Sequence, residues 1–207
     1  MVFSSTIFLL YFLPFFLLIY YLADVRFKNY VALAFSIFFY AWGAPDFIFI
    51  VLGSVVIDFY IVQKMYNAIG NKKKLWLAAS VVLNLGLLAY FKYANFFVDN
   101  FNSLLNVFGS GNIHLAKIIM PIGISFFSFQ KFTYGIDVFR GKHKPLKKVS
   151  DLALYILLFP QLIAGPIVRY GEIADSLNDR TNNENFENRL TGLYRFILGL
   201  SKKVLIA

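Results

Sequence analysis

Apolar stretches of membrane-spanning length alternate with short polar connections along most of this chain. A helix that crosses a bilayer needs about 20 apolar residues, and it satisfies its own backbone hydrogen bonds. The pattern predicts an all-α fold, a polytopic membrane protein built as a multi-helix bundle. The predicted spans are 2–23, 29–43, 47–66, 75–92 and 115–139, followed by a broken apolar segment at 152–168 and a last apolar run from about 190 onward.

Two of these segments contain helix-breaking residues. Residues 120–141, MPIGISFFSFQKFTYGIDVFRG, include a proline and three glycines, and residues 152–168 include Pro160 and Pro166. A proline removes a backbone donor and kinks or ends a helix. Lipid cannot bond the backbone groups that are freed, so irregular backbone must face protein or a cavity. The bundle is therefore predicted to contain broken or re-entrant helices.

A polar stripe runs along the first of these segments. If 121–138 is helical, about a third of its circumference carries Gly123, Gln130, Thr133, Tyr134 and Asp137. Two interpretations stay open. The stripe either bonds neighbouring helices or forms the wall of a substrate cavity.

Asp58 lies within the apolar segment 47–66, where a charge is costly unless it reaches a partner or water. Asn84, midway along 75–92, is its predicted partner. An interhelical hydrogen bond would account for the pair, and so would a proton or substrate path.

Two longer connections separate the apolar segments. Residues 93–114 combine asparagines with phenylalanines and are predicted to form an amphipathic helix on the membrane surface. Residues 171–189 are hydrophilic and are predicted to form a loop or a short interfacial helix.

The basic residues predict an orientation. Hydrophobic residues make up 59% of the chain, which excludes an ordinary water-soluble domain, and the net charge is +9. Because the basic residues flank spans, they indicate topology, and we expect no nucleic-acid partner. By the positive-inside tendency their connections face the cytoplasm, which leaves the N-terminus extracytoplasmic. These residues are Arg26, Lys28, Lys72, Lys73, Lys74, Arg140, Lys142, Lys144, Lys147 and Lys148.

Catalytic and metal-ligating side chains are scarce. The chain has no cysteine and two histidines, so a Cys/His zinc site cannot form and no metal is expected. His143 lies among basic residues and His114 beside glycines, and neither is assigned a catalytic role. No phosphate-binding loop and no serine nucleophile elbow occur.

Three blocks of this chain resemble the membrane-bound O-acyltransferase family, in the bacterial branch typified by alginate O-acetylation proteins. The blocks are MPIGISFFSFQKFTYGIDVFRG at 120–141, FPQLIAGPIVRYGEI at 159–173 and GLYRFILGLSKKVLIA at 192–207, and the opening hairpin, with 35–59, is similar as well. The resemblance implies a tunnel that joins a cytoplasmic acyl donor to an extracytoplasmic acceptor hydroxyl. Together with the stripe, the resemblance implies which residues line the wall of the tunnel or cavity. These are Pro121, Gly123, Gln130, Tyr134, Asp137, Gln161, Gly165, Pro166 and Arg169.

The resemblance also implies a function. It implies a bacterial inner-membrane enzyme that transfers acetyl from acetyl-CoA or another thioester to an envelope or secreted polysaccharide such as alginate, with no bound cofactor. The expected partners are membrane lipid and either the polysaccharide or extracytoplasmic acetyltransferase proteins. The alternatives are D-alanyl or other acyl transfer to a cell-wall polymer, a non-catalytic membrane scaffold, and a transporter-like protein.

The family's catalytic histidine does not map onto this sequence. The resemblance places it beyond Ala207, in a later Trp-His block that these 207 residues lack. We therefore expect residues 1–207 to be the N-terminal part of a single O-acyltransferase domain, truncated before the catalytic histidine. The sequence predicts no catalytic residue here, and no acyl transfer by this part alone.

Overall fold

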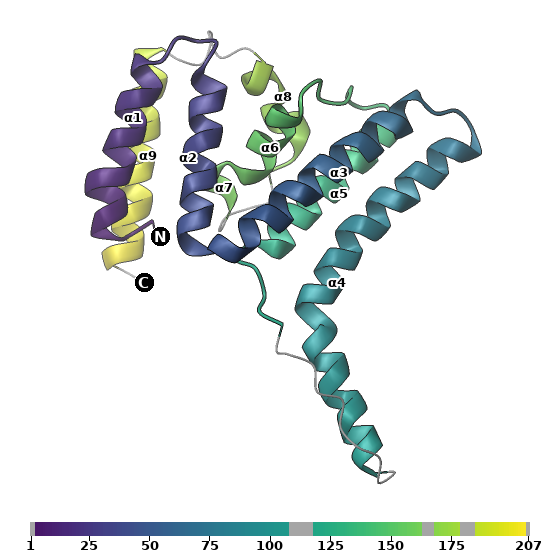
Figure 1. The fold of residues 1–207 in the computed structure, drawn as a ribbon. Coiled ribbons are helices and arrows are strands. Elements are labelled where there is room, and N and C mark those ends of the chain that lie inside the picture. Colours follow the sequence, from purple (N-terminus) through teal and green to yellow (C-terminus); the bar gives the residue numbers. More distant parts are fainter. Residues whose placement is uncertain (1–2, 108–117, 163–167, 179–184, 206–207) are drawn as a thin grey trace.

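The residues that the structure describes fold mainly into helices (Figure 1). The computed structural model describes residues 3–107, 118–162, 168–178 and 185–205, and these contain no strand, which confirms the all-α prediction. A π-helical turn at Phe8–Phe12 and a 3-10 turn at Pro45–Phe47 precede α1 and α3. The α-helices are α1 Leu13–Leu22, α2 Lys28–Gly43, α3 Ile48–Asn67, α4 Asn71–Val107, α5 Ile124–Phe139, α6 Val149–Leu157, α7 Phe159–Leu162, α8 Tyr170–Asn178 and α9 Phe186–Leu205.

The core forms where α2, α3 and α5 pack around α6, and α4 packs on α3 and α5. Helix α6 is apolar on every side between Leu152 and Leu157, and each of these side chains is at most 5% exposed. A helix that is apolar all round belongs inside a bundle. Gly135 lets α5 approach α4 closely, because a Cβ at this position would lie 3.3 Å from Ser80 Oγ.

A second, aromatic cluster joins the N-terminal helices to α7. The rings of Phe8, Phe12 and Phe39 surround Phe159, and the Phe12 and Phe159 rings are perpendicular with centroids 5.3 Å apart. Edge-to-face pairs of this kind add to the stabilisation from burial. The N-terminal helices are therefore anchored on the broken-helix segment.

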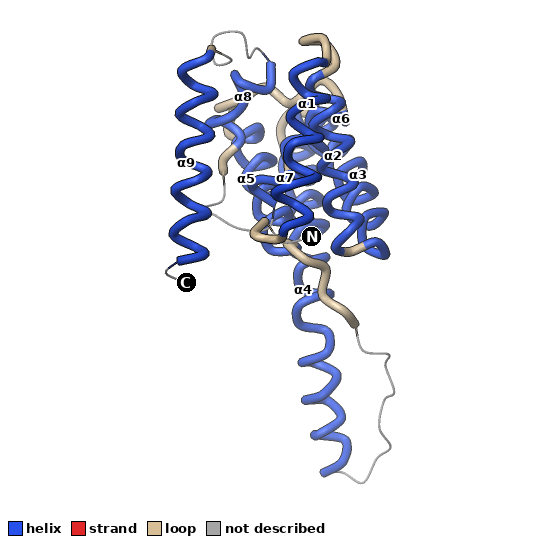
Figure 2. The backbone as a smooth tube through the Cα atoms, turned by 90° about the vertical axis from the view of Figure 1, so that its left-hand side faces the viewer, coloured by secondary structure: helices blue, strands red, loops and turns tan. Residues whose placement is uncertain are grey.

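Helix α4 differs from its prediction. The sequence predicted a span at 75–92 and a separate surface helix within 93–114, but one helix of 37 residues continues to Val107. It is roughly 55 Å long at 1.5 Å per residue, and its second half projects beyond the other helices (Figures 1 and 2). No proline or glycine follows Gly86 within α4, and amides such as Asn100 bond the preceding turn, so nothing ends the helix at residue 92. Residues 108–114 lie outside the described residues.

Among the described residues, two helices are long and apolar enough to cross a membrane, within Pro45–Asn67 and Asn71–Asn106. Helices α1, α2 and α5 have 10, 16 and 16 residues, shorter than the roughly 20 that a straight crossing needs. The segment predicted at 115–139 is helical only from Ile124, because Pro121 and Gly123 hold the preceding residues in a turn, and 115–117 lie outside the described residues. The number of crossings stays a prediction.

The basic connections lie at one end of the bundle. The connections between α1 and α2, α3 and α4, and α5 and α6 all lie at the top of Figure 1, as their charges predicted. Gln63 Nε2 donates to the Leu146 carbonyl at 2.6 Å, and Lys73 Nζ lies 5.0 Å from the centroid of the Phe139 ring. These contacts fix the ends of α3, α4 and α5 together.

Candidate functional site

The predicted helix break lies between α6 and α7. Leu158, with φ −51° and ψ 111°, leaves the helical region, and Pro160 follows in the first turn of α7, where its missing N–H costs little. The freed Phe159 N–H donates to Ser36 Oγ of α2 at 3.2 Å, and Gln161 Nε2 donates to the Tyr155 carbonyl at 2.5 Å. Protein groups thus satisfy the irregular backbone. This confirms the broken helix expected in 152–168.

A second irregular segment leads into α5. Gly123 has φ +77°, a conformation that L side chains rarely adopt, and an added Cβ would lie 2.9 Å from the Leu162 carbonyl oxygen. The Tyr40 hydroxyl donates to the Ile122 carbonyl at 3.2 Å. The turn before α5 therefore lies directly against α7, so the two helix-breaking segments of the sequence meet in space.

One face of α5 turns toward α6 and α8. Tyr134 lies edge-on to Tyr170, with ring centroids 5.2 Å apart, and its hydroxyl accepts from the Leu146 N–H at 2.8 Å. Gln130, one turn earlier on this face, is 1% exposed, and its amide has no hydrogen-bond partner among the described residues. Asp137, one turn later, lies 3.5 Å from Lys142 Nζ. The predicted stripe thus lies largely against protein.

A neighbouring face of α5 contributes to a buried polar cluster. Asp58 Oδ1 accepts from Ser80 Oγ at 2.6 Å and from Asn84 Nδ2 at 3.0 Å, and this confirms the predicted Asp58–Asn84 contact. Lys131 Nζ donates to Ser54 Oγ at 2.8 Å. None of the five side chains is more than 4% exposed. The cluster joins α3, α4 and α5.

The sequence analysis missed Lys131 and its neighbours Ser54 and Ser80. A signal was present, because Lys131 is the single charged residue between positions 121 and 136 of an apolar segment. It lies off the stripe on which that analysis concentrated. Serines in a helix gave no signal, since many bond their own backbone, as Ser54 does with the Val51 carbonyl at 2.7 Å.

The residues predicted to line a tunnel are spread over the two irregular segments and one face of α5. Pro121 and Gly123 precede α5, Gln130, Tyr134 and Asp137 lie on it, Gln161 is in α7, and the exposed Arg169 directly precedes α8. Gly165 and Pro166 lie outside the described residues. The structure brings Gly123 into contact with α7 and Tyr134 with α6 and α8. The role of these residues as a tunnel wall stays a prediction.

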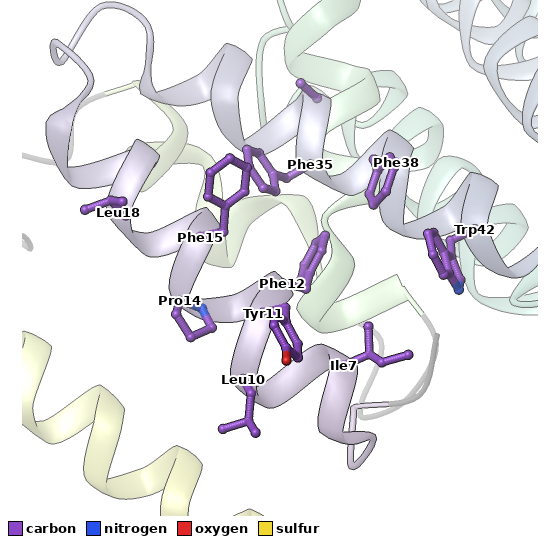
Figure 3. Close-up of a pocket in the computed structure, with 11 residues that line it drawn as sticks. Ile7, Leu10, Tyr11, Phe12, Pro14, Phe15, Leu18, Phe35, Phe38 and Trp42 are labelled. Atoms are coloured by element: carbon purple, nitrogen blue, oxygen red, sulfur yellow. The ribbon is translucent and has the colours of Figure 1, made fainter.

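Two pockets adjoin α1. The first, of about 900 Å³, lies between α1 and α2, and Figure 3 shows Phe12, Phe15, Phe35, Phe38 and Trp42 around it. The second, of about 590 Å³, lies between α1 and α9. The residues predicted to line a tunnel border neither pocket. The walls of the first are almost wholly apolar, so it suits hydrocarbon and offers no groups for acid–base chemistry.

The histidine and acidic side chains do not gather into a metal site in the described part of the chain, where no three of them lie close enough to hold an ion. His143 packs edge-on against Tyr170 with ring centroids 5.5 Å apart, and His114 lies outside the described residues. The structure therefore adds no reason to assign either one a catalytic role.

The predicted place of the catalytic histidine, beyond Ala207, is not tested by the structure. Helix α9 is described as far as Leu205, and Ala207 itself lies outside the described residues. The absence of an assigned catalytic residue from positions 1–207 therefore stays a prediction.

Known proteins match the chain over its whole length. It is 41% identical to the probable alginate O-acetylase AlgI of Pseudomonas syringae pv. tomato and 41% identical to that of Pseudomonas aeruginosa, over 100% of this chain and 40% of each relative. It is 32% identical to the peptidoglycan O-acetyltransferase of Helicobacter pylori, over 100% of this chain and 44% of that protein. No family model and no solved structure matches.

These matches run through the helical hairpin, both irregular segments and the buried polar cluster, since they leave no part of the chain uncovered. The chain spans about 40% of the length of the alginate relatives. At this level of identity over every residue, the chain is related along its whole length to the proteins named as probable alginate O-acetylases.

Proposed function

We propose that this chain is part of a polytopic inner-membrane enzyme that transfers acetyl groups to hydroxyls of an envelope or secreted polysaccharide. The observation that carries the proposal is the 41% identity, along the whole chain, to proteins named as probable alginate O-acetylases. A relative named for peptidoglycan shares 32%, so the acceptor could be either kind of polymer. Alginate or an alginate-like secreted polymer is our first choice, because the higher identity is to those relatives.

The proposed reaction is attack by an acceptor hydroxyl on the carbonyl carbon of a thioester, either acetyl-CoA or another acyl donor. The new C–O bond forms as the C–S bond breaks, and the hydroxyl proton passes to a base while the thiol leaves. Residues 1–207 supply no assigned base, so we place that group in the part of the full-length enzyme that this chain does not cover. The contribution of this chain is to hold both reactants in line, which is a large share of catalysis in such reactions.

The orientation of the proposed enzyme follows from its basic end. Lys72, Lys73 and Lys74 at the start of α4 lie at the same end as the connection 140–148 (Figure 1). We place this end in the cytoplasm, where basic connections concentrate and where an anionic thioester would be attracted. The N-terminus lies at the opposite end of α1 and is then extracytoplasmic.

The proposed tunnel wall is the region where the two irregular segments meet. Irregular backbone at membrane depth is tolerated only against protein or a water-filled cavity, and the Gly123–Leu162 contact lies inside the bundle. Gln130 supports the assignment, since its buried amide has both a donor and an acceptor left over in the described structure. Such an amide suits a polar reactant or water.

The proposed partners are membrane lipid and the recipient of the acetyl group. That recipient is either the polysaccharide itself or an extracytoplasmic acetyltransferase that passes the group on. In this function the chain is part of a catalyst. A membrane scaffold, by contrast, would only hold other enzymes together.

The test is deletion of the full-length gene in its source bacterium, followed by measurement of ester-linked acetate and ester-linked D-alanine on purified polymers. We expect acetate esters to fall on one polymer and to return with the plasmid-borne gene. Loss of D-alanine esters with acetate unchanged would contradict the proposal. Purified full-length protein with labelled acetyl-CoA then separates an enzyme from a scaffold, because a scaffold consumes no thioester.

A further inference from the structure

Two opposite charges lie near each other inside the three-helix unit formed by α3, α4 and α5. Asp58 and Lys131 are both 0% exposed, and they come from α3 and α5. Burying one charge without compensation is very costly, whereas a pair of opposite charges compensates in part. Lys131 Nζ donates to Ser54 Oγ, which lies one turn before Asp58 on α3, yet no nitrogen–oxygen contact of 4.0 Å or less joins the Lys131 and Asp58 side chains. The pair is therefore close but not in direct contact.

The cluster leaves hydrogen-bonding capacity unused. An ammonium group has three donors, and the one bond that Lys131 Nζ makes among the described residues goes to Ser54 Oγ. Asp58 Oδ2 and Asn84 Oδ1 are fully buried and have no hydrogen-bond partner in the described structure. The cluster thus has unused donors on α5 and unused acceptors on α3 and α4. Buried polar groups are nearly always satisfied, so we expect these atoms to be hydrogen-bonded in the protein.

The chemistry of the site selects its occupant. A metal cation would be repelled by the Lys131 ammonium, and an anion would be repelled by the Asp58 carboxylate. Water is neutral, accepts from an ammonium and donates to a carboxylate and an amide oxygen at once. A buried water typically makes about three such bonds, and it bridges polar atoms that stand roughly 5 Å apart.

The site lies at a similar distance along all three helices, measured from the basic end. Asp58 lies nine residues before the end of α3, Lys131 eight residues before the end of α5, and Ser80 nine residues after the start of α4. At 1.5 Å per residue each is about 12–14 Å from the basic end. In the proposed membrane setting that distance would place the cluster well inside a hydrocarbon core of about 30 Å.

We propose that Asp58 and Lys131 form a water-bridged charge pair at mid-depth of the bundle, with one internal water molecule held by Lys131 Nζ, Asp58 Oδ2 and Asn84 Oδ1. The pair makes the unit neutral where charge is most expensive. It joins α3 to α5 through a bound solvent molecule. The site is independent of the proposed acyl transfer, and so is its test.

The first experiment is a double-mutant cycle in the full-length protein, read as the melting temperature of detergent-purified material. Asp58→Asn and Lys131→Met each leave one buried charge alone, so each should lower the melting temperature by several degrees. The double variant removes both charges, and its melting temperature should lie above that of the worse single variant. Additive losses would overturn the proposal, because two residues that do not interact give additive effects.

Asp137 and Lys142 are the matched control, since they form a partly exposed ion pair at 3.5 Å, in which the Lys142 side chain is 54% and the Asp137 side chain 15% exposed. Asp137→Asn and Lys142→Met should give small, additive shifts, because exposed pairs contribute little. If a single variant at 58 or 131 cannot be recovered from membranes while the double variant can, that rescue also supports the pair.

The second experiment keeps the proposal falsifiable if no variant folds. A cryo-electron microscopy structure of the unmodified full-length protein, at a resolution that shows ordered solvent, should contain a peak within about 3.2 Å of Lys131 Nζ and Asp58 Oδ2. A direct contact between the ammonium and the carboxylate would overturn the proposal. So would an empty gap between them.

Discussion

Two glycines at the ends of α5 show how much depends on a single position. Gly123 and Gly141 both have positive φ, at 77° and 72°, yet only Gly123 has backbone against its missing side chain. From the sequence, both glycines were predicted to interrupt the apolar segment. It could not show which of the two touches another segment, because the Leu162 carbonyl is distant in the chain.

We expect Gly123→Ala to destabilise the full-length protein more than Gly141→Ala does. Both substitutions force alanine into the left-handed region, at about 1–2 kcal/mol each, but only the first also pushes a Cβ to 2.9 Å from the Leu162 oxygen. Thermal unfolding in detergent measures the difference. Equal losses would mean that the contact with α7 has no energetic weight.

We expect Gln130→Leu to lower acetyl transfer by roughly tenfold or more without lowering the amount inserted in the membrane. The leucine removes a buried amide that has no partner in the described residues, so the melting temperature should stay level or rise. The readouts are polymer-bound acetate and the amount of membrane protein, with Phe129→Leu, at the 38% exposed neighbouring position, as control. Unchanged acetylation would remove Gln130 from the cavity wall.

At the scale of elements, prolines were reliable signals and asparagines were not. The break before Pro160 was predictable, because proline acts on its own backbone and on its immediate neighbours. The end of α4 was misplaced, because the asparagines of 93–107 suggested a connection, whereas the amide of Asn100 bonds within the helix and that of Asn95 bonds beyond it. Asn95 is the clearest case. Its side chain accepts from the Ile118 N–H at 3.0 Å and donates to the Ile118 carbonyl at 2.8 Å.

We expect Asn95→Ala to release the segment that leads from α4 into α5. Two hydrogen bonds to Ile118 are lost, so amide exchange in peptides that cover 118–123 should accelerate on the order of tenfold. Asn100→Ala is the control, because that exposed amide bonds only the Phe96 carbonyl of its own helix. Hydrogen–deuterium exchange with mass spectrometry reads both variants. Identical exchange in the two would show that Asn95 does not hold this turn.

At the scale of the whole molecule, the charge pattern predicted correctly that the basic connections share one end. It could not predict which helix occupies the centre. Helix α6, with six consecutive buried residues from Leu152, resembles a short apolar segment in the sequence, and only its contacts with α2, α3 and α5 reveal it as core. Such contacts join residues far apart in the chain, which local patterns do not encode.

The absence of cysteine from residues 1–207 makes their orientation directly measurable. We expect a cysteine in place of Lys144, at the basic end, to resist a membrane-impermeant maleimide in intact cells and to react after permeabilisation. A cysteine in place of Asn106, near the far end of α4, should react in both conditions. The reverse pattern would invert the proposed topology, and the full-length protein must first be cleared of any further cysteines.

The buried charge pair also imposes an order in time. Ribosomes work at roughly 5–20 residues per second, so Asp58 leaves the ribosome several seconds before Lys131 does. In the proposed membrane setting, Asp58 of α3 first accepts hydrogen bonds from Ser80 and Asn84 of α4. It meets the lysine of α5 only later, once that helix has been synthesised. Helices α3 and α4 would thus enter the bilayer as a hairpin, and α5 would complete it, so biogenesis proceeds by groups of helices and not by single ones.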